Sequence, residues 1–216
     1  SNDETISILK KFDHQISWVS QKDKGQTDAI NKGLRNASGK IVTYLNVDDL
    51  LLPGSLERVA KEFITHPDIF WLTGRCRIVD DQGKEIRKLV TFYKNLLLLS
   101  KSRNILLVTN YVSQPATFWR RSIMEKAGWL DEKLNFVMDY DYWLRLWNLA
   151  PPRIIQHELA AFRIHQQSKT TSAGHLHRYI DEESQVIARS TGSSFWRGLH
   201  SLHRRVMTLL YAKING

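Results

Sequence analysis

The most restrictive feature of this sequence is a short apolar run, residues 41–45, that leads directly into Asn46, Val47, Asp48 and Asp49. An apolar run bounded by turn residues predicts a buried strand in an α/β sheet. Ligands of such sheets bind just beyond the carboxyl ends of the strands. Adjacent carboxylates repel each other, so a cation or water usually accompanies them. Two interpretations stay open here: a divalent metal carrying a phosphate-containing substrate, or a solvated turn whose Asp residues cap the next helix.

Helical and extended patterns alternate along the chain, which favours an α/β fold. Apolar residues recur every three to four positions in the expected helices, whereas apolar and polar residues alternate in several expected strands. We expect helices over residues 4–12, through 29–34 with an end near 38–39, and over 53–67, 122–127 and 140–149. We expect strands over 16–20, 41–45, 69–74, 116–119, 154–155 and 159–164, a hairpin over 75–79 and 84–90, and a mobile or short-helical segment over 91–112.

The formal net charge of +9 points to an anionic partner, for which nucleotide phosphates, acidic lipid and nucleic acid are the three classes. The single cysteine, Cys76, excludes an intrachain disulfide and fits a reducing compartment. The longest leucine run, residues 96–99, is far too short to span a bilayer. We therefore expect a cytoplasmic protein.

The tail beyond residue 175 has a different pattern. Phe195, Leu199, Leu202 and Val206 recur at helical spacing among basic residues, and no acidic residue follows Glu183. Such a basic amphipathic helix either packs its apolar stripe onto the domain or a partner, or lies on an anionic membrane surface through residues 194–216. The second interpretation makes the protein peripheral to the inner face of the membrane.

Several motifs occur in a fixed order along the chain. They are SNDETISILKKF (1–12), DKGQTDAINKG (23–33), NVDD (46–49), QPATFWRR (114–121), GWLDE (128–132) and MDYDYWLRL (138–146). In this order they resemble the GT-A nucleotide-sugar glycosyltransferases of glycosyltransferase family 2, in which NVDD stands at the position of the DxD motif. The resemblance covers roughly residues 1–172.

The resemblance implies a GT-A, Rossmann-like mixed sheet flanked by helices over residues 1–172, followed by a basic amphipathic helical tail over 173–216. Family members begin with a strand, a nucleotide-binding loop and a second strand, which would all precede Ser1. We therefore expect the chain to lack the first strands and part of the nucleotide pocket. Either the sequence is a fragment of a longer protein, or a second chain completes the sheet.

The resemblance also implies a donor site for a nucleotide sugar and a divalent cation, Mg²⁺ or Mn²⁺. Asp48 and Asp49 are hard oxygen ligands for such an ion. His165 lies where family members often place a histidine near the metal, although a packed or surface histidine is the alternative. Asn46 replaces the first Asp of the motif and is assigned to donor binding. Lys24, Gln26 and Asp28 are assigned to the nucleotide from a loop-to-helix junction, where a helix cap explains Asp28 equally well.

For the acceptor half, the resemblance makes Asp139 the general base, at the start of a helix where the dipole favours a carboxylate. An N-cap role explains the same position. Gln114, Trp119, Trp129 and Trp143 are assigned to the acceptor, because aromatic faces suit the apolar sides of sugar rings; core packing is the alternative for the tryptophans.

The expected function is metal-dependent, inverting transfer of a sugar from a nucleotide-sugar donor to a glycan or lipid-linked acceptor, as in polysaccharide biosynthesis. The alternative is a non-catalytic or incomplete GT-A-like module that binds a partner or carbohydrate. Nucleic acid is not an expected partner, since only the charge suggests it and no motif accompanies it.

Overall fold

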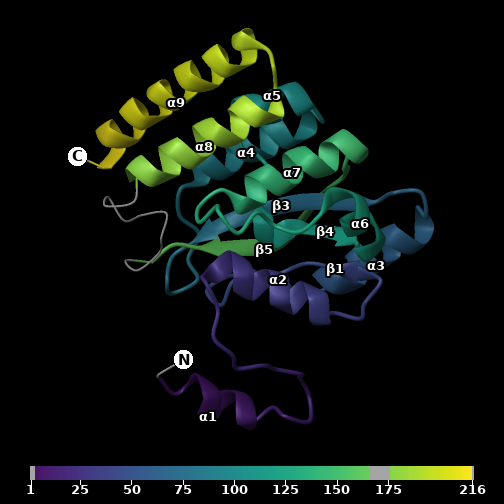
Figure 1. Cartoon of the computed structure of the whole chain (residues 1–216). Helices are drawn as coiled ribbons and strands as arrows, with labels where there is room; N and C mark the ends of the chain where they lie inside the picture. The colour runs from purple at the N-terminus through teal and green to yellow at the C-terminus, as the bar shows by residue number, and fades with distance from the viewer. Residues whose placement is uncertain (1–2, 166–175, 216) are drawn as a thin grey trace.

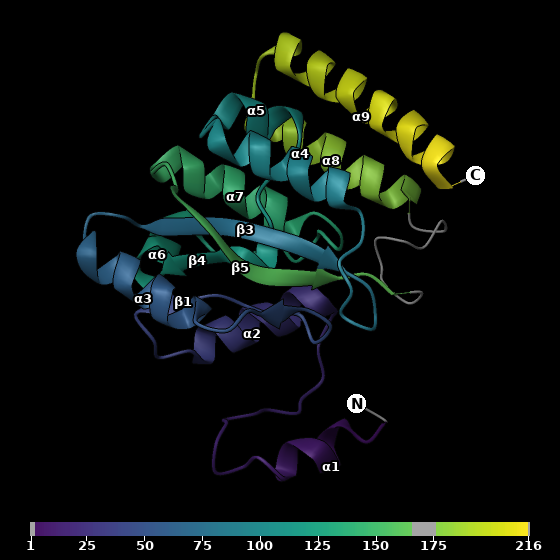
Figure 2. The same ribbon diagram turned by 180° about the vertical axis from the view of Figure 1, so that it is seen from behind.

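A computed structural model describes residues 3–165 and 176–215 of the chain, with side chains up to residue 210. A mixed sheet lies between helices, with α3 against one face and α7 and α8 on the other side, and α9 outermost (Figure 1). The predicted α/β architecture with helices flanking a mixed sheet is therefore confirmed. The first helix, α1 (Thr5–Lys10), buries no residue and lies away from the sheet in both views (Figure 2).

The sheet has five strands in the order β1-β4-β3-β5-β2. Its strands are β1 (Ile41–Val42), β2 (Leu50–Leu51), β3 (Trp71–Val79), β4 (Thr117–Arg120) and β5 (Arg153–Arg163). β3 and β5 are parallel, and the other neighbours are antiparallel. β1 lies at one edge of the described sheet; the expectation that another chain adds strands there stays a prediction.

The longest pairing, between β3 and β5, contains a register shift between Gly74 and Cys76. A Cβ atom at Gly74 would lie 2.7 Å from the side chain of Leu159, so only glycine permits the two strands to approach this closely. The shift bends β5, whose carboxyl end then passes beside β2 and the segment that follows β1.

The helices agree with the predicted pattern in most places. They are α2 (Gln26–Asn36), α3 (Ser55–Thr65), α4 (Lys88–Leu99), α5 (Arg103–Val108), α6 (Met124–Ala127), α7 (Met138–Leu149), α8 (Leu176–Ser190) and α9 (Ser194–Asn215), with 3₁₀ turns at Gln114–Ala116 and Arg121–Ile123. The largest core cluster joins α7, α8 and one face of β1, β3 and β4, whereas Val59 and Phe63 of α3 pack on the opposite face.

Three predicted elements differ, wholly or in part, from the structure. Residues 16–20 form no strand, because no neighbouring strand in the described chain accepts their backbone hydrogen bonds. The hairpin over 75–90 is much shorter than predicted: β3 ends at Val79, a single antiparallel bridge joins Val79 to Glu85, and α4 begins three residues after Glu85. The segment 91–112, expected to be mobile or short-helical, contains most of α4 and all of α5.

The C-terminal helices pack against the body of the molecule. The His200 side chain is 3% exposed, and its Nδ1 lies 3.0 Å from the carbonyl oxygen of Val108. Val186 and Ile187 of α8 belong to the main core. The predicted boundary between residues 172 and 173 falls outside the described residues.

Candidate functional site

The site is built on the segment that follows β1. Residues 43–45 follow β1 without regular secondary structure, and the backbone N–H of Asp49 then donates to the carbonyl oxygen of Asn46, which closes a turn over 46–49. β2 follows immediately and pairs with Ala160 and Ala161 of β5. This pairing places the end of β5 beside the turn, because Arg163 and His165 are the next residues along that strand's path.

A chain of side-chain amides holds the turn to its neighbours. Gln26 Nε2, at the start of α2, donates to Asn46 Oδ1 at 3.0 Å. Asn46 Nδ2 donates to Asp49 Oδ2 and to Gln114 Oε1, both at 3.2 Å, and Gln114 Nε2 donates to the Tyr44 carbonyl. Every amide in this chain has a fixed orientation, because reversing Asn46 would set its oxygen against two acceptors. Asparagine therefore serves this position as a donor, which an aspartate cannot do.

Asp49 faces inward. It is 3% exposed, and its Oδ1 accepts the Arg163 backbone N–H at 3.0 Å, while its Oδ2 accepts from Asn46. Burial raises the pKa of Asp49 to about 6, in spite of the two hydrogen bonds that favour its ionised form. Both oxygens are thus used within the protein, and Asp49 supports the turn more directly than it offers a metal ligand.

Asp48 is the carboxylate that remains available. Its side chain is 31% exposed, and its Oδ2 lies 3.2 Å from Nε2 of His165. Two neighbouring ligands of an octahedral ion with bonds of about 2.1 Å stand roughly 3 Å apart, so this pair fits one side of a Mg²⁺ or Mn²⁺ site. No group of three His, Cys, Asp or Glu side chains with metal-binding geometry occurs among the described residues. The protein would therefore supply two ligands, and substrate phosphates and water would supply the rest.

Asp139 lies within electrostatic range of Tyr44. It occupies the first turn of α7, where its Oδ1 accepts the Tyr140 backbone N–H at 2.7 Å. Burial raises the pKa of Asp139 above its ordinary value, opposed by this hydrogen bond and by the charge of Lys94. Burial also raises the pKa of the Tyr44 hydroxyl, and the charges of Asp139 and Asp49 add to the effect. Tyr44 therefore stands within electrostatic range of both halves of the predicted site.

Lys94 is a site residue that the sequence interpretation missed. It lies on α4 within electrostatic range of Asp139, and burial lowers the pKa of its ammonium group. Thr91 and Leu98, three residues before it and four after it, are both buried, so Lys94 lies on the inward face of the helix. A lysine at that position of an otherwise apolar stripe was the signal available in the sequence.

The nucleotide residues assigned at the α2 junction divide into two groups. Gln26 reaches Asn46, as described above, whereas Asp28 is 6% exposed and accepts from the Lys24 backbone N–H and from Lys32 Nζ, both at 2.8 Å. The Lys32 side chain lowers the pKa of Asp28 most. Asp28 thus stabilises the loop at the start of α2, as the helix-cap interpretation expects. The exposed Lys24 side chain lies on the same loop.

The acceptor assignments need the largest correction. Trp119 and Trp143 are 0% exposed and pack against each other in the core, with ring centroids 5.6 Å apart. Neither face is open to a sugar, because Trp71 and Tyr142 cover them. Gln114 is also buried, and it belongs to the amide chain around Asn46 rather than to a separate acceptor surface.

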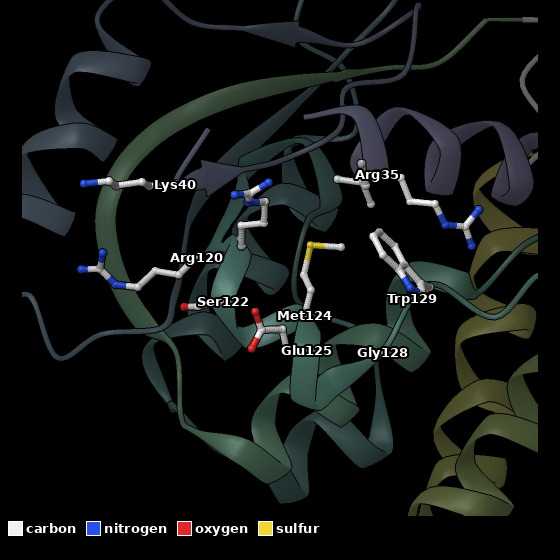
Figure 3. Close-up of a pocket in the computed structure, with 10 residues that line it drawn as sticks. Arg35, Lys40, Arg120, Ser122, Met124, Glu125, Gly128 and Trp129 are labelled. Atoms are coloured by element: carbon white, nitrogen blue, oxygen red, sulfur yellow. The ribbon is translucent and has the colours of Figure 1, made fainter. Parts of the chain in front are cut away.

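Trp129 is exposed but lies elsewhere. It lines an open pocket of about 760 Å³ formed by α2, the start of β1 and the region around α6. Figure 3 shows Arg35, Lys40 and Arg120 around this pocket, and the Arg35 guanidinium lies 4.8 Å from the centre of the Trp129 ring. None of Asp48, Asp139 or Lys94 lines it.

With this geometry, the comparison with known families is decisive. A family model described as glycosyl transferase family 2 matches residues 1–128. The chain belongs to glycosyl transferase family 2. The match includes the turn over 46–49 and ends before Asp139, which lies in the part of the chain that the family model does not cover.

Relatives with curated names extend over more of the chain. An uncharacterized glycosyltransferase of Rickettsia prowazekii is 23% identical over 100% of this chain and 69% of the relative. An uncharacterized glycosyltransferase of Methanocaldococcus jannaschii is 25% identical over 67% of this chain and 50% of the relative, and one of Nostoc sp. is 26% identical over 86% and 58%. The chain thus spans between half and about two thirds of these relatives.

The fold is also similar to solved structures. The crystal structure of S. aureus TarS 1–349 in complex with UDP-GlcNAc superposes with a TM-score of 0.64 and 17% identity, covering 88% of this chain and 54% of TarS 1–349. The structure of TarS 1–349 without that ligand gives a TM-score of 0.61. These similarities confirm the predicted GT-A fold.

Proposed function

We propose that this family 2 chain carries a metal-dependent, inverting glycosyltransferase site that moves a sugar from a nucleotide-sugar donor to a glycan or lipid-linked acceptor. The observation that carries the proposal is that Tyr44, whose carbonyl accepts from Gln114 of the amide chain, lies within electrostatic range of both Asp49 and Asp139. One half suits a nucleoside diphosphate, and the other suits an acceptor hydroxyl. The structure of TarS with UDP-GlcNAc makes a UDP-sugar the first donor to test.

The donor half offers polar groups at the end of a strand. Asp48 and His165 would hold the divalent ion, which neutralises the charge that develops on the leaving diphosphate. Asn46 and Gln26 face this region through the amide chain, and the exposed Lys24 supplies a cation two residues before Gln26. Asp49 holds the turn against the end of β5 by accepting the backbone N–H of Arg163.

Asp139 serves as the base. The acceptor oxygen attacks the anomeric carbon as the bond from that carbon to the diphosphate breaks, and the hydroxyl proton passes to the Asp139 carboxylate. One in-line displacement of this kind inverts the anomeric configuration. Burial favours proton uptake by Asp139, since it raises the pKa of the carboxyl group, and Lys94 keeps enough positive charge nearby for the ionised form to exist before the reaction.

The test measures binding and turnover separately. Titration calorimetry of UDP with Mn²⁺, and then with EDTA, reports on the donor half, and release of UDP from UDP-GlcNAc or other nucleotide sugars reports on transfer or hydrolysis. We expect Mn²⁺-dependent binding and measurable UDP release. Binding of carbohydrate without any nucleotide binding would support the alternative, a non-catalytic GT-A-like module. A folded protein that also contains the strands expected before Ser1, and that binds no nucleoside diphosphate with any divalent ion, would refute the proposal.

A further inference from the structure

Two helices expose long apolar stripes on the far side of the molecule from α3. On α4, Leu89, Phe92, Leu96 and Leu99 are 80%, 67%, 53% and 50% exposed. On α9, Leu202, Val206 and Leu209 are 58%, 46% and 69% exposed. Contiguous exposed apolar surface of this kind is uncommon on a monomer and marks an interaction site.

The two stripes lie near each other because one side-chain contact joins the helices. The Tyr93 hydroxyl of α4 lies 2.8 Å from Nε2 of His203 of α9, and the two rings stack with centroids 6.2 Å apart. Figure 2 shows that the helices run in opposite directions, since α4 begins near the end of the molecule where α9 finishes. Tyr93 and His203 therefore mark corresponding points on an antiparallel helix pair.

The exposed residues occupy matching positions around these points. On α4 they stand four and one residues before Tyr93 and three and six residues after it. On α9, Leu202, Val206 and Leu209 stand one before, three after and six after His203. On antiparallel helices that face each other at Tyr93 and His203, equal offsets from these two residues place both stripes on the same side of the pair. We call this surface, formed by the seven residues named above, the α4–α9 face.

Neither helix of the α4–α9 face carries an acidic residue. No acidic residue occurs between Glu85 and Glu125, a stretch that includes all of α4, and none occurs after Glu183, which includes all of α9. Lys88 and Arg205, both exposed, lie at the outer edges of the two stripes by helical position. Apolar stripes bordered by cations, with no carboxylate among them, fit an interface between acyl chains and anionic headgroups.

We propose that the α4–α9 face docks this chain onto an anionic phospholipid bilayer, with both helices lying in the plane of the interface. No helix in the described chain is long and apolar enough to cross a bilayer. Lys94 points inward from α4, opposite the stripe, so docking sets the Lys94 side of the candidate site about one helix diameter, roughly 10 Å, from the lipid. That placement suits a lipid-linked acceptor, and this consequence rests on the proposed function. The docking itself does not depend on the proposed function.

Vesicle flotation tests the docking directly. The chain should float with vesicles of phosphatidylcholine and phosphatidylglycerol but not with phosphatidylcholine alone, and added salt should weaken binding. Phe92→Glu and Leu202→Glu should each weaken binding at least about tenfold, since each places a charge where an apolar side chain would enter the interface. Ile64→Glu is the matched control, because Ile64 is 80% exposed on α3, across the sheet, and should bind as the wild type does.

Two results would overturn the proposal. Wild-type protein that does not float with anionic vesicles, or Ile64→Glu protein that loses binding as Phe92→Glu does, removes the lipid surface from this face. Light scattering could instead show a dimer that the Phe92→Glu substitution dissociates. If neither the dimer nor the monomer binds lipid, the face is a contact between two copies of the chain. Circular dichroism of each variant shows that these exposed substitutions leave the fold unchanged.

Discussion

Replacing Asn46 with aspartate restores the first acid of the DxD pattern, and the structure predicts that it destabilises the protein. Asn46 Nδ2 donates to Asp49 Oδ2 and to Gln114 Oε1, both at 3.2 Å. A carboxylate at position 46 still accepts from Gln26 but donates to neither. The change therefore breaks two hydrogen bonds and brings two carboxylates together in a largely buried place.

The size of the effect follows from the pKa of Asp49, which burial raises to about 6. The two carboxylates need not repel each other at full strength, because Asp49 can take up a proton and donate it to residue 46. At pH 7, protonating a group with a pKa of about 6 costs about 1.4 kcal/mol. The unpaired Gln114 oxygen adds about 1 kcal/mol, so Asn46→Asp should lower the free energy of unfolding by roughly 2–3 kcal/mol at pH 7.

The pH dependence distinguishes this mechanism from general damage. The folded variant binds a proton on Asp49 that the unfolded chain has released, so its stability relative to the wild type falls as pH rises above 6 and recovers as pH falls below it. Urea unfolding should show a loss of about 1 kcal/mol at pH 5 and the larger loss at pH 7. Asn104→Asp, an exposed change in the first turn of α5, is the control and should shift stability by less than about 0.5 kcal/mol at either pH. Equal stability of Asn46→Asp and wild type at pH 7, or a loss that does not change with pH, would refute the amide chain as described.

The remaining predictions concern catalysis and packing. Asp139→Asn should lower the rate of transfer by about 100- to 10,000-fold while the urea midpoint changes little, and a variant within tenfold of wild type would exclude Asp139 as the base. Because burial raises the pKa of Asp139, wild-type transfer should decline on the acid side at a pH above 3.8, the ordinary value for aspartate; a flat rate down to that pH would contradict the assignment. Trp143→Ala should destabilise the fold by about 3–5 kcal/mol in urea unfolding, whereas Trp129→Ala, at a side chain 41% exposed, should cost far less; similar losses would contradict the division between core and surface. Gly74→Ala should also destabilise the fold, because its Cβ would lie 2.7 Å from the side chain of Leu159, and an unchanged urea midpoint would show that the two strands separate freely.

Much of the fold could be predicted from local patterns. The spacing of apolar residues indicates which side chains are buried in the helices α2, α3 and α7 and in the strands β3 and β4. Residues 16–20 show where such patterns stop, because a strand needs a partner and alternation along one segment says nothing about the next. The same limit explains why α4 was not predicted as one helix. Its leucines are mostly exposed while Thr91 and Leu98 are buried, so the sequence shows no clear amphipathic pattern.

The sequence indicated the carboxylates of the candidate site but not the side chains that hold them in position. Asp48 and Asp139 could be singled out because carboxylates after a strand and at a helix start are chemically distinctive, and their roles stay predictions. The role of Gln114 required knowledge of which segments meet, since it lies 68 residues from Asn46 in sequence. Trp119 and Trp143 were misassigned because a tryptophan's sequence position does not reveal whether its faces meet solvent or, as here, other rings.

The most direct test of the central claim is to locate a bound Mn²⁺ ion in the presence of UDP by its paramagnetic broadening of backbone NMR signals. The proposed site predicts that broadening is centred on Asp48 and His165, depends on UDP, and is lost in Asp48→Asn. Asp81→Asn, in the exposed turn after β3, should leave the pattern unchanged. Broadening centred on another part of the chain, or an unchanged pattern in Asp48→Asn, would contradict a metal–diphosphate site at the 46–49 turn.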